Sequence, residues 1–296
     1  MSNDNNDNPV RRRLPPWLKR PMGCGHTYQQ VKEVLAELEL ATVCASAGCP
    51  NQGECFSQGT ATFMILGEVC TRDCQFCRVA HGAAAPVSAD EPARVAEAAA
   101  RLQLRHVVLT SVTRDDLPDG GAEHFARTIQ AIRQRQPNAT IEVLTPDFKG
   151  ETDCLDTVCA AGPEVFNHNL ETTRKLTPEI RSGADYERSL EVLRYVAKKE
   201  NGPLVKSGLM LGLGETEEEI HELLRDLRET GVQLLTIGQY LRPGKQNRNV
   251  QKFYRPEEFT AFQARAEAMG FEHVAAGPFV RSSYHAGKTV VELKSR

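Results

Sequence analysis

Six of the nine cysteines in this 296-residue chain fall into two short groups, and their spacing is the most informative feature of the sequence. Cys70, Cys74 and Cys77 form a C-x₃-C-x₂-C group. Three thiolates in one loop can converge on a cuboidal iron–sulfur cluster, because such clusters take soft sulfur ligands. Three ligands leave one iron of a [4Fe–4S] cluster open to bind a small molecule. A structural zinc site is the alternative, with His81 as the nearby histidine.

The second group, Cys44, Cys49 and Cys55, has the spacing C-x₄-C-x₅-C and precedes the first along the chain. It also offers three thiolates, one short of a full protein ligand set for a cluster. A disulfide or a zinc ion is the alternative. Cys154 and Cys159 are interpreted as structural, because a five-residue spacing on a helix does not place two side chains on a shared ligand face. The isolated Cys24 is interpreted as incidental.

The composition is that of an ordinary globular protein, with 40% hydrophobic and 25% charged residues. A net charge of −3 provides no general attraction for nucleic acid. The sequence contains no apolar stretch long enough for a transmembrane helix, and its polar start is unlike a secretory signal. We therefore expect the protein to lie in the reducing cytoplasm, where its thiols remain free to bind metal. The basic residues near the start, 11–13 with Lys19 and Arg20, are interpreted as a solvated tail, and a docking patch for an acidic partner is the alternative.

Strand and helix patterns alternate from about residue 60 onward. A helix is expected over 28–40, and little regular structure over 41–59. Strands are then expected over 60–69, 106–112, 140–144, 164–168, 204–211 and 233–239, and helices over 92–102, 122–135, 153–160, 186–199, 217–230 and 256–269. This alternation predicts an α/β fold with a parallel sheet. Six units suit either an open doubly wound sheet or a barrel short of eight units.

Polar and glycine-rich segments follow several of these strands, where the functional residues of parallel α/β folds lie. Residues 119–121 read Asp-Gly-Gly, residues 167–171 read Asn-His-Asn-Leu-Glu, and residues 208–215 read Gly-Leu-Met-Leu-Gly-Leu-Gly-Glu. Glycine permits close approach of a ligand to the backbone, although a plain turn explains it equally well. The segments therefore mark the expected face of a binding site.

The C-x₃-C-x₂-C loop resembles the signature of the radical S-adenosylmethionine (SAM) superfamily. The resemblance implies that the open iron of a [4Fe–4S] cluster binds the amino and carboxylate groups of SAM. Reduction of the sulfonium by one electron then yields a radical that takes hydrogen from unactivated carbon. The SAM contacts that the resemblance implies are Phe76, Asp119, Gly120, Gly121, Asn169, Glu171, Arg181, Gly212, Gly214 and Glu215.

Over about residues 28–287 the chain more narrowly resembles the lipoyl synthase family. The matching segments are 41–44 (ATVC), 49–55 (CPNQGEC), 59–64 (GTATFM), 110–117 (TSVTRDDL), 167–169 (NHN), 213–216 (LGET), 237–243 (IGQYLRP) and 281–286 (RSSYHA). The resemblance implies a partial (β/α)6 TIM-like barrel over 60–277. It also implies an N-terminal extension over 1–59 that carries the second cysteine group, and a C-terminal segment over 278–296.

In this family the second group holds an auxiliary [4Fe–4S] cluster whose fourth ligand is a serine. We assign that ligand to Ser282 and keep Ser283 open, because the sequence does not say which side chain points inward. The implied reaction inserts two sulfur atoms at C6 and C8 of a protein-bound octanoyl-lysine, with the auxiliary cluster as sacrificial sulfur donor.

The implied partners are octanoylated lipoyl-carrier domains, namely 2-oxoacid dehydrogenase acyltransferase subunits and the glycine-cleavage carrier protein. An electron donor such as ferredoxin or flavodoxin is also implied, and neither nucleic acid nor a membrane is expected. Two alternatives remain. A biotin-synthase-like sulfurtransferase would lack the second cysteine group and the RSSY segment. An iron–sulfur carrier or electron-transfer protein would need no glycine-rich cofactor strands.

Overall fold

The computed structural model describes residues 14–20 and 23–287. The basic run at 11–13 and the last part of the predicted C-terminal segment, 288–296, lie outside these residues. At the centre is a sheet of seven strands in the order β1-β4-β5-β6-β7-β8-β9, in which every neighbouring pair is parallel. Each strand therefore pairs with the next central strand along the chain, as in a barrel and unlike a doubly wound sheet.

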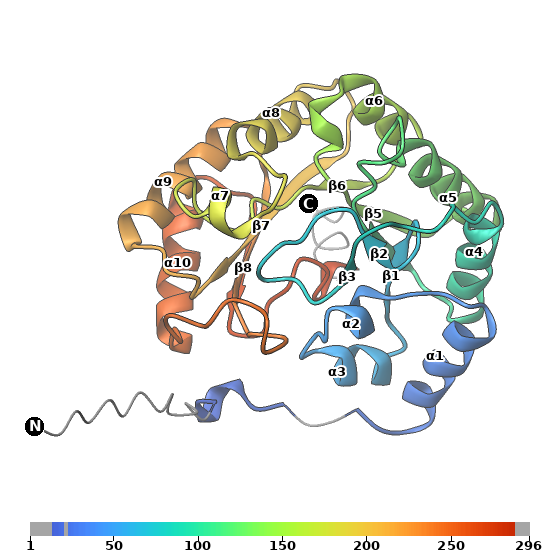
Figure 1. The fold of residues 1–296 in the computed structure, drawn as a ribbon, viewed down its shortest axis with the longest axis horizontal. Helices are drawn as coiled ribbons and strands as arrows, with labels where there is room; N and C mark the ends of the chain where they lie inside the picture. Colours follow the sequence, from blue (N-terminus) through green and yellow to red (C-terminus); the bar gives the residue numbers. More distant parts are fainter. Residues whose placement is uncertain (1–13, 21–22, 288–296) are drawn as a thin grey trace, which may run out of the picture.

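The strands of the central sheet are β1 (Thr62–Ile65), β4 (His106–Ser111), β5 (Thr140–Leu144), β6 (Val165–Asn167), β7 (Leu204–Leu211), β8 (Leu234–Gln239) and β9 (His273–Gly277). The helices that follow them are α4 (Glu91–Arg101), α5 (Ala122–Arg135), α6 (Thr152–Ala160), α8 (Tyr186–Ala197), α9 (Glu217–Glu229) and α10 (Pro256–Ala268). These helices form an outer arc around the strands (Figure 1). The edge strands β1 and β9 pair with no strand on their outer sides among the described residues, so the barrel is open.

The predicted α/β fold and partial barrel are confirmed, but six strands was one too few. The missed strand, β9, reads His-Val-Ala-Ala-Gly, and only Val274 in it is buried. Its small side chains give no alternation of apolar and polar residues, so its pairing with β8 decides that it is a strand. The predicted limits of α5, β5 and β7 agree with the structure.

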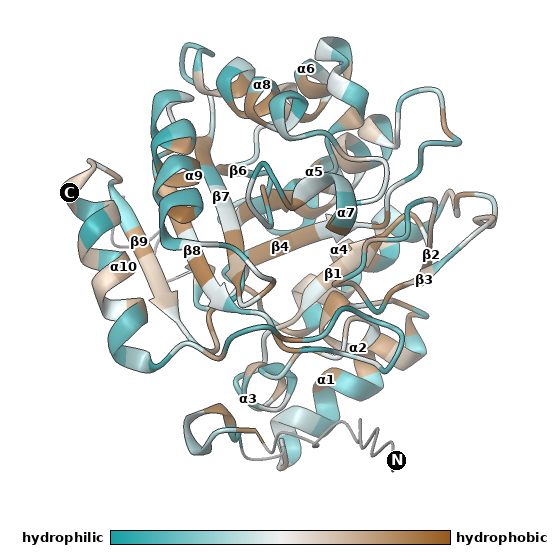
Figure 2. Cartoon of the chain, turned by 60° about the vertical axis from the view of Figure 1, so that its left-hand side comes forward, coloured by the Kyte–Doolittle hydropathy of each residue, from teal (hydrophilic) through white to brown (hydrophobic). Residues whose placement is uncertain are grey.

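Apolar periodicity explains why these segments pack as they do. On α9 the buried residues Ile220, Leu223, Leu224 and Leu227 recur at helical spacing. Thr216 begins this helix with a capping box, because its side chain accepts from the Glu219 N–H and the Glu219 carboxylate accepts from the Thr216 N–H. Figure 2 shows the strands hydrophobic and the outer helical faces hydrophilic.

The expectation of little regular structure over 41–59 is wrong. Two short helices form there, α2 (Val43–Ser46) and α3 (Gln52–Ser57), after α1 (His26–Glu37). Thr42 caps α2 by accepting a hydrogen bond from the Ala45 N–H. Helices of four and six residues are too short to show a helical period in the sequence. The smaller elements are η1 (Pro16–Leu18), η2 (Phe148–Gly150), α7 (Thr177–Ile180) and the two-residue strands β2 (Val69–Cys70) and β3 (Ala80–His81).

No helix in the described part of the chain is both long enough and apolar enough to span a membrane.

Candidate functional site

The first cysteine group lies in a loop framed by β2 and β3, which pair in parallel and hold the two ends of the loop together. Burial, opposed by the charge of Arg181 and aided by the neighbouring Cys77 and Cys70 thiols, raises the pKa of Cys74 to about 12. Burial likewise raises the pKa of Cys77 to about 11. The three thiols are therefore close enough to interact, and Cys74 and Cys77 stay protonated unless a cation stabilises their thiolates. This is the donor set of a soft-metal centre.

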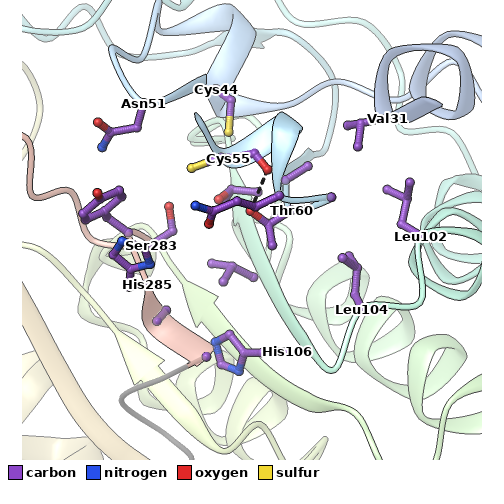
Figure 3. Close-up of a pocket in the computed structure, with 18 of the residues that line it drawn as sticks. Val31, Cys44, Asn51, Cys55, Thr60, Leu102, Leu104, His106, Ser283 and His285 are labelled. Atoms are coloured by element: carbon purple, nitrogen blue, oxygen red, sulfur yellow. Dashed lines mark hydrogen bonds between the residues drawn. The ribbon is translucent and has the colours of Figure 1, made fainter. Parts of the chain in front are cut away.

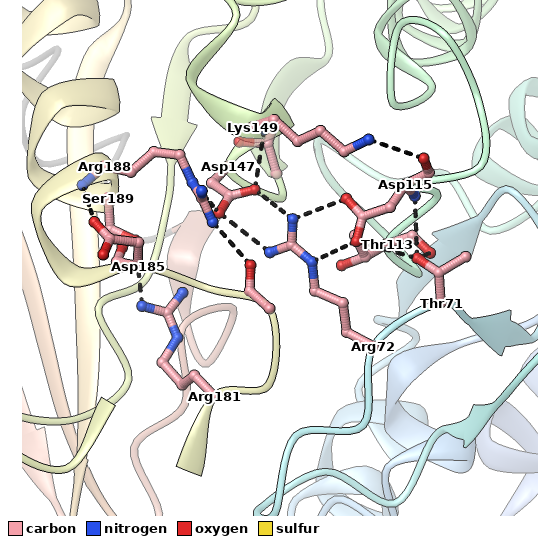
Figure 4. A network of polar contacts seen from close by, with 12 residues as sticks. Thr71, Arg72, Thr113, Asp115, Asp147, Lys149, Arg181, Asp185, Arg188 and Ser189 are labelled. Carbon is pink, nitrogen blue, oxygen red and sulfur yellow. Dashed lines mark hydrogen bonds and ion pairs between the residues drawn. The ribbon is translucent and has the colours of Figure 1, made fainter. Parts of the chain in front are cut away.

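A buried polar network fixes this loop to the barrel (Figure 4). The Arg72 Nε donates to Asp115 Oδ2 at 2.7 Å, and its Nη2 donates to Asp147 Oδ1 at 2.8 Å. Arg188 Nε donates to the other oxygen of Asp147 at 2.9 Å. Burial alone would raise the pKa of Asp147, but the hydrogen bonds and charges of Arg72 and Arg188 hold it well below its usual range. The cysteine loop is thus tied to the segments after β4 and β5.

Three of the predicted SAM contacts gather beside Cys74. Asn169 Nδ2 donates to Glu171 Oε1 at 2.9 Å, and Arg181 interacts electrostatically with both Glu171 and Cys74. Burial raises the pKa of Glu171. Glu171 has a φ of 65°, the left-handed conformation that a non-glycine residue seldom adopts. Its N–H donates to the Gly208 carbonyl at 3.0 Å, which holds this conformation against β7.

The strand ends in this region present buried polar atoms without a hydrogen-bond partner among the described residues. They are Thr145 Oγ1, Asn167 Oδ1, His168 Nε2, Asn169 Oδ1, Thr172 Oγ1 and Thr173 Oγ1. Unpaired buried polar groups are costly, and their concentration at one end of the barrel indicates a polar ligand. Donors and acceptors of this kind fit the amino acid and ribose portions of SAM.

Glu215 has a clear local role. Its carboxylate accepts from the N–H groups of Gly212 at 2.5 Å, Leu213 at 2.9 Å and Gly214 at 3.0 Å, and from the Tyr254 hydroxyl at 3.1 Å. A Cβ at Gly212 would lie 2.4 Å from Gln239 Nε2. The segment after β7 is therefore shaped by its own carboxylate, and direct contact with SAM stays a prediction.

The segment 119–121 is explained in a similar way. The Asp119 carboxylate accepts from the Gly121 N–H at 2.9 Å and from the Glu123 N–H at 2.9 Å, which caps α5. A Cβ at Gly121 would lie 2.3 Å from Leu66 Cδ1, and one at Gly120 would lie 3.1 Å from Phe148. These glycines have a packing reason, and their contact with SAM also stays a prediction.

Phe76 packs at the edge of a separate apolar cluster that contains Ile180, Leu213 and Tyr240. Packing therefore accounts for this aromatic residue between the last two cysteines, and its contact with SAM stays a prediction.

The second cysteine group lines a cavity of about 860 Å³ between α2, α3 and the C-terminal segment (Figure 3). Burial, with a contribution from the neighbouring thiols, raises the pKa of Cys44 to about 11 and that of Cys55 to about 12. Cys49 also lines the cavity. The three predicted ligands are thus brought together in space.

The side chains of the two candidate serines, Ser282 and Ser283, face different sites. Ser283 lines the cavity of the second cysteine group, together with Arg281, Tyr284 and His285. The Ser282 Oγ instead accepts a hydrogen bond from Asn169 Nδ2 at 2.7 Å. Ser282, the residue assigned from the sequence, therefore faces the predicted SAM site, and Ser283 faces the second group.

Contacts from both ends of the chain assemble this second site. Asn51 Nδ2 donates to the Phe279 carbonyl at 2.6 Å, and the Tyr284 hydroxyl donates to Glu54 Oε1 at 3.0 Å. Arg20 forms an ion pair with Glu54, and its guanidinium lies 4.3 Å from the centre of the Phe279 ring. Residues before and after the barrel thus close over α3.

No three His, Cys, Asp or Glu side chains among the described residues are arranged to hold a single metal ion. All nine cysteines are free thiols, and Cys24, Cys154 and Cys159 lie outside both groups. Sequence reasoning missed Arg72, Asp147 and Gly208 as parts of the site. Gly208 stood within a segment already singled out, whereas the Arg72–Asp147 pair spans 75 residues and leaves no local pattern.

Two kinds of similarity define the class of protein. The radical SAM superfamily matches residues 64–227, and the N-terminal domain of lipoyl synthase of the radical SAM family matches residues 2–49. The crystal structure of methylornithine synthase superposes with a TM-score of 0.54 and 13% identity, covering 92% of this chain and 93% of that one. Streptococcus suis SuiB bound to S-adenosylmethionine gives a TM-score of 0.56 and 13% identity, over 83% and 54% of the two chains. With the cysteine loop, these similarities define a protein of the radical SAM superfamily.

Curated relatives narrow the assignment. The lipoyl synthase of Rubrobacter xylanophilus is 54% identical over 92% of this chain and 85% of its own length. That of Thermus thermophilus is 53% identical over 97% of this chain and 90% of its own length. The chain belongs to the lipoyl synthase family.

Proposed function

We propose that the two cysteine groups hold two [4Fe–4S] clusters with different roles. Cys70, Cys74 and Cys77 hold the cluster that binds SAM, and Cys44, Cys49 and Cys55 hold an auxiliary cluster. Ser283, rather than Ser282, supplies the fourth ligand of the auxiliary cluster. The observation that carries this proposal is the cavity in which Ser283, from the end of the chain, meets the three thiols of the second group.

The reaction is that of lipoyl synthase, the insertion of two sulfur atoms at C6 and C8 of a protein-bound octanoyl chain. When bound, the clusters and SAM supply one-electron chemistry at unactivated carbon and the sulfur to be inserted. The chain itself supplies binding and orientation.

The residues beside Cys74 divide this work. The Arg181 guanidinium provides positive charge for a carboxylate, and Asn169 Oδ1 and Glu171 provide acceptors for amino and hydroxyl groups. Their burial excludes water, which strengthens each interaction. Asn169 and Arg181 are 6% and 7% exposed.

The proposed substrates are octanoylated lipoyl-carrier domains of 2-oxoacid dehydrogenase acyltransferase subunits and the glycine-cleavage carrier protein. A small electron-transfer protein such as ferredoxin or flavodoxin is the proposed reductant. We infer a cytoplasmic location, which is supported by nine free thiols, since an oxidising compartment would favour disulfides.

The test compares two cysteine variants with the wild type under anaerobic conditions. Iron and sulfide are counted before and after addition of SAM, a reductant and an octanoyl-lysyl peptide. We expect wild-type enzyme to lose iron in step with lipoyl product. Cys55→Ala should cleave SAM but form no lipoyl product, and Cys74→Ala should do neither.

Two results would contradict the proposal. Lipoyl product from Cys55→Ala would show that the second group does not supply sulfur. Failure of the reduced wild type to cleave SAM would favour a cluster carrier or electron-transfer protein.

A further inference from the structure

Ser282 and Ser283 are neighbours in the chain but belong to different sites. Ser283 lines the cavity of the second cysteine group, and Ser282 is hydrogen bonded to Asn169, which also donates to Glu171, a neighbour of Cys74. One short segment therefore forms part of both sites. Ser282 does not face the second cysteine group, so its function differs from that of Ser283.

The hydrogen bonds of Asn169 define that role. An amide NH₂ group has two donors, and here one goes to Glu171 Oε1 at 2.9 Å and the other to Ser282 Oγ at 2.7 Å. With both donors used, the orientation of the amide is fixed. Its Oδ1 is buried and has no partner among the described residues, so it is available to a ligand.

The barrel interior is built to receive this segment. A Cβ at Gly208 would lie 2.4 Å from Thr236 Oγ1 and 3.2 Å from Ser282 Oγ. A Cβ at Gly238 would lie 2.2 Å from the Val280 carbonyl oxygen. Glycine at these positions of β7 and β8 leaves the space that the segment occupies.

A buried lysine fixes the backbone of the segment. Lys206 Nζ donates to the Ser282 carbonyl at 2.5 Å and pairs with Glu142 Oε1 at 2.8 Å. The next residue upstream, Arg281, interacts electrostatically with Cys49 of one site and Glu171 of the other. Residues 281–283 therefore lie between the two cysteine groups.

We propose that Ser282 is a positioning residue for the SAM site. It holds the Asn169 amide, and through it Glu171, in the orientation that binds SAM, while Ser283 serves the auxiliary centre. The proposal rests on the proposed function, in which Asn169 and Glu171 contact SAM.

The test measures SAM affinity and metal content in the cluster-loaded enzyme. Ser282→Ala should weaken equilibrium binding of SAM about threefold to tenfold, the effect of one lost hydrogen bond. Its iron and sulfide content and its KM for the octanoyl peptide should stay at wild-type values. Ser283→Ala is the matched control, because it removes the adjacent hydroxyl. It should lose iron from the auxiliary site.

A double-mutant cycle with Asn169→Ala isolates the proposed interaction. If Ser282 acts through Asn169, then Ser282→Ala should weaken SAM binding little or not at all once Asn169 is already alanine. Hydrogen exchange gives a second readout: SAM should protect residues 278–287 in the wild type and protect them less in Ser282→Ala.

Four outcomes would overturn the proposal. Loss of auxiliary iron from Ser282→Ala with unchanged SAM affinity would make Ser282 the ligand. Additive effects of the two alanine substitutions would show that Ser282 does not act through Asn169. If the wild type binds SAM and Ser282→Ala binds it equally well, the positioning role fails while the proposed function stands. A wild type that does not bind SAM would instead remove the proposed function and this role with it.

Discussion

The two cysteine groups are held by opposite structural means. The first sits in one loop, and its anchor is the Arg72–Asp147 pair, in which the side chains are 8% and 0% exposed. The second is held by contacts between the chain ends, and its outer ion pair joins Arg20 and Glu54, whose side chains are 29% and 26% exposed. The hydrogen bond from Asn51 to the Phe279 carbonyl, in the same site, spans 228 residues.

This difference matches the different demands that the proposed function makes on the two sites. A centre that binds a cofactor repeatedly benefits from rigid ligands fixed to the barrel. A centre that gives up part of its contents must open and be refilled. Closure by chain ends through half-exposed contacts permits opening without unfolding the barrel, since such segments open at low free-energy cost.

Among the variants that test this difference between the two sites, Asp147→Ala is expected to lower the free energy of unfolding most. The substitution leaves the Arg72 and Arg188 guanidinium groups without their shared carboxylate, and breaking a buried pair costs about 3–5 kcal/mol. Urea unfolding should show this loss, and iron should fall first at the Cys70–Cys77 loop. Asp156→Ala, which breaks an exposed pair with Lys199 on the barrel, is the control and should change little. Equal stability of the two variants would remove the claim of a rigid first site.

Lys206→Met tests the link between barrel and chain end. It removes the ammonium partner of the Glu142 carboxylate in the barrel interior and leaves His106 Nε2, at 3.6 Å, as its remaining basic neighbour, again at a cost of about 3–5 kcal/mol. The double variant Lys206→Met/Glu142→Gln should recover part of this stability because no charge is left unpaired. Neither variant should hold the Ser282 carbonyl, so hydrogen exchange over 278–287 should speed up in both. Unchanged exchange in the double variant would show that Lys206 does not anchor the segment.

His168→Gln tests the acid response of the first site. Burial and the charge of Arg181 lower the pKa of His168 to about 4. The unfolded chain has a histidine pKa of about 6.5, so it takes up this proton first as the pH falls. The free energy of unfolding should therefore decrease between pH 6.5 and 4, by about 3 kcal/mol from this group. The variant, compared with the wild type at matched iron content, should lose that part of the slope. Identical slopes would mean that His168 is not buried in its neutral form.

The smallest effect on stability is expected from Arg20→Ala. Its ion pair with Glu54 is half-exposed, and such pairs contribute less than about 1 kcal/mol. Iron should nevertheless leave the Cys44–Cys55 site faster under a chelator, because Arg20 also contacts Tyr284 and Phe279 over that site. Arg135→Ala, which removes an exposed pair with Glu97 on the barrel helices, should leave iron release unchanged. Equal release rates would show that the N-terminal segment does not close the second site.

Features that are encoded locally could be predicted from the sequence. In the C-x₃-C-x₂-C and C-x₄-C-x₅-C groups only a few residues separate neighbouring cysteines. The three thiols of each group therefore stay close together, within one loop or across two short helices. Helical and strand periods are also local, and the limits of α5, β5 and β7 could be predicted from them. The polar residues after the fourth predicted strand are also a local feature, and they predicted one side of the site.

The tertiary structure decided what depends on distant partners. Strand β9 has little apolar pattern and exists because β8 pairs with it. Arg72 and Asp147 find each other only when the folded barrel brings the segments after β2 and β5 together. Ser282 and Ser283 lie in an irregular turn, where no period says which side chain points where. Their directions follow from Lys206 and from the space that Gly208 and Gly238 leave, contacts that exist only in the folded chain.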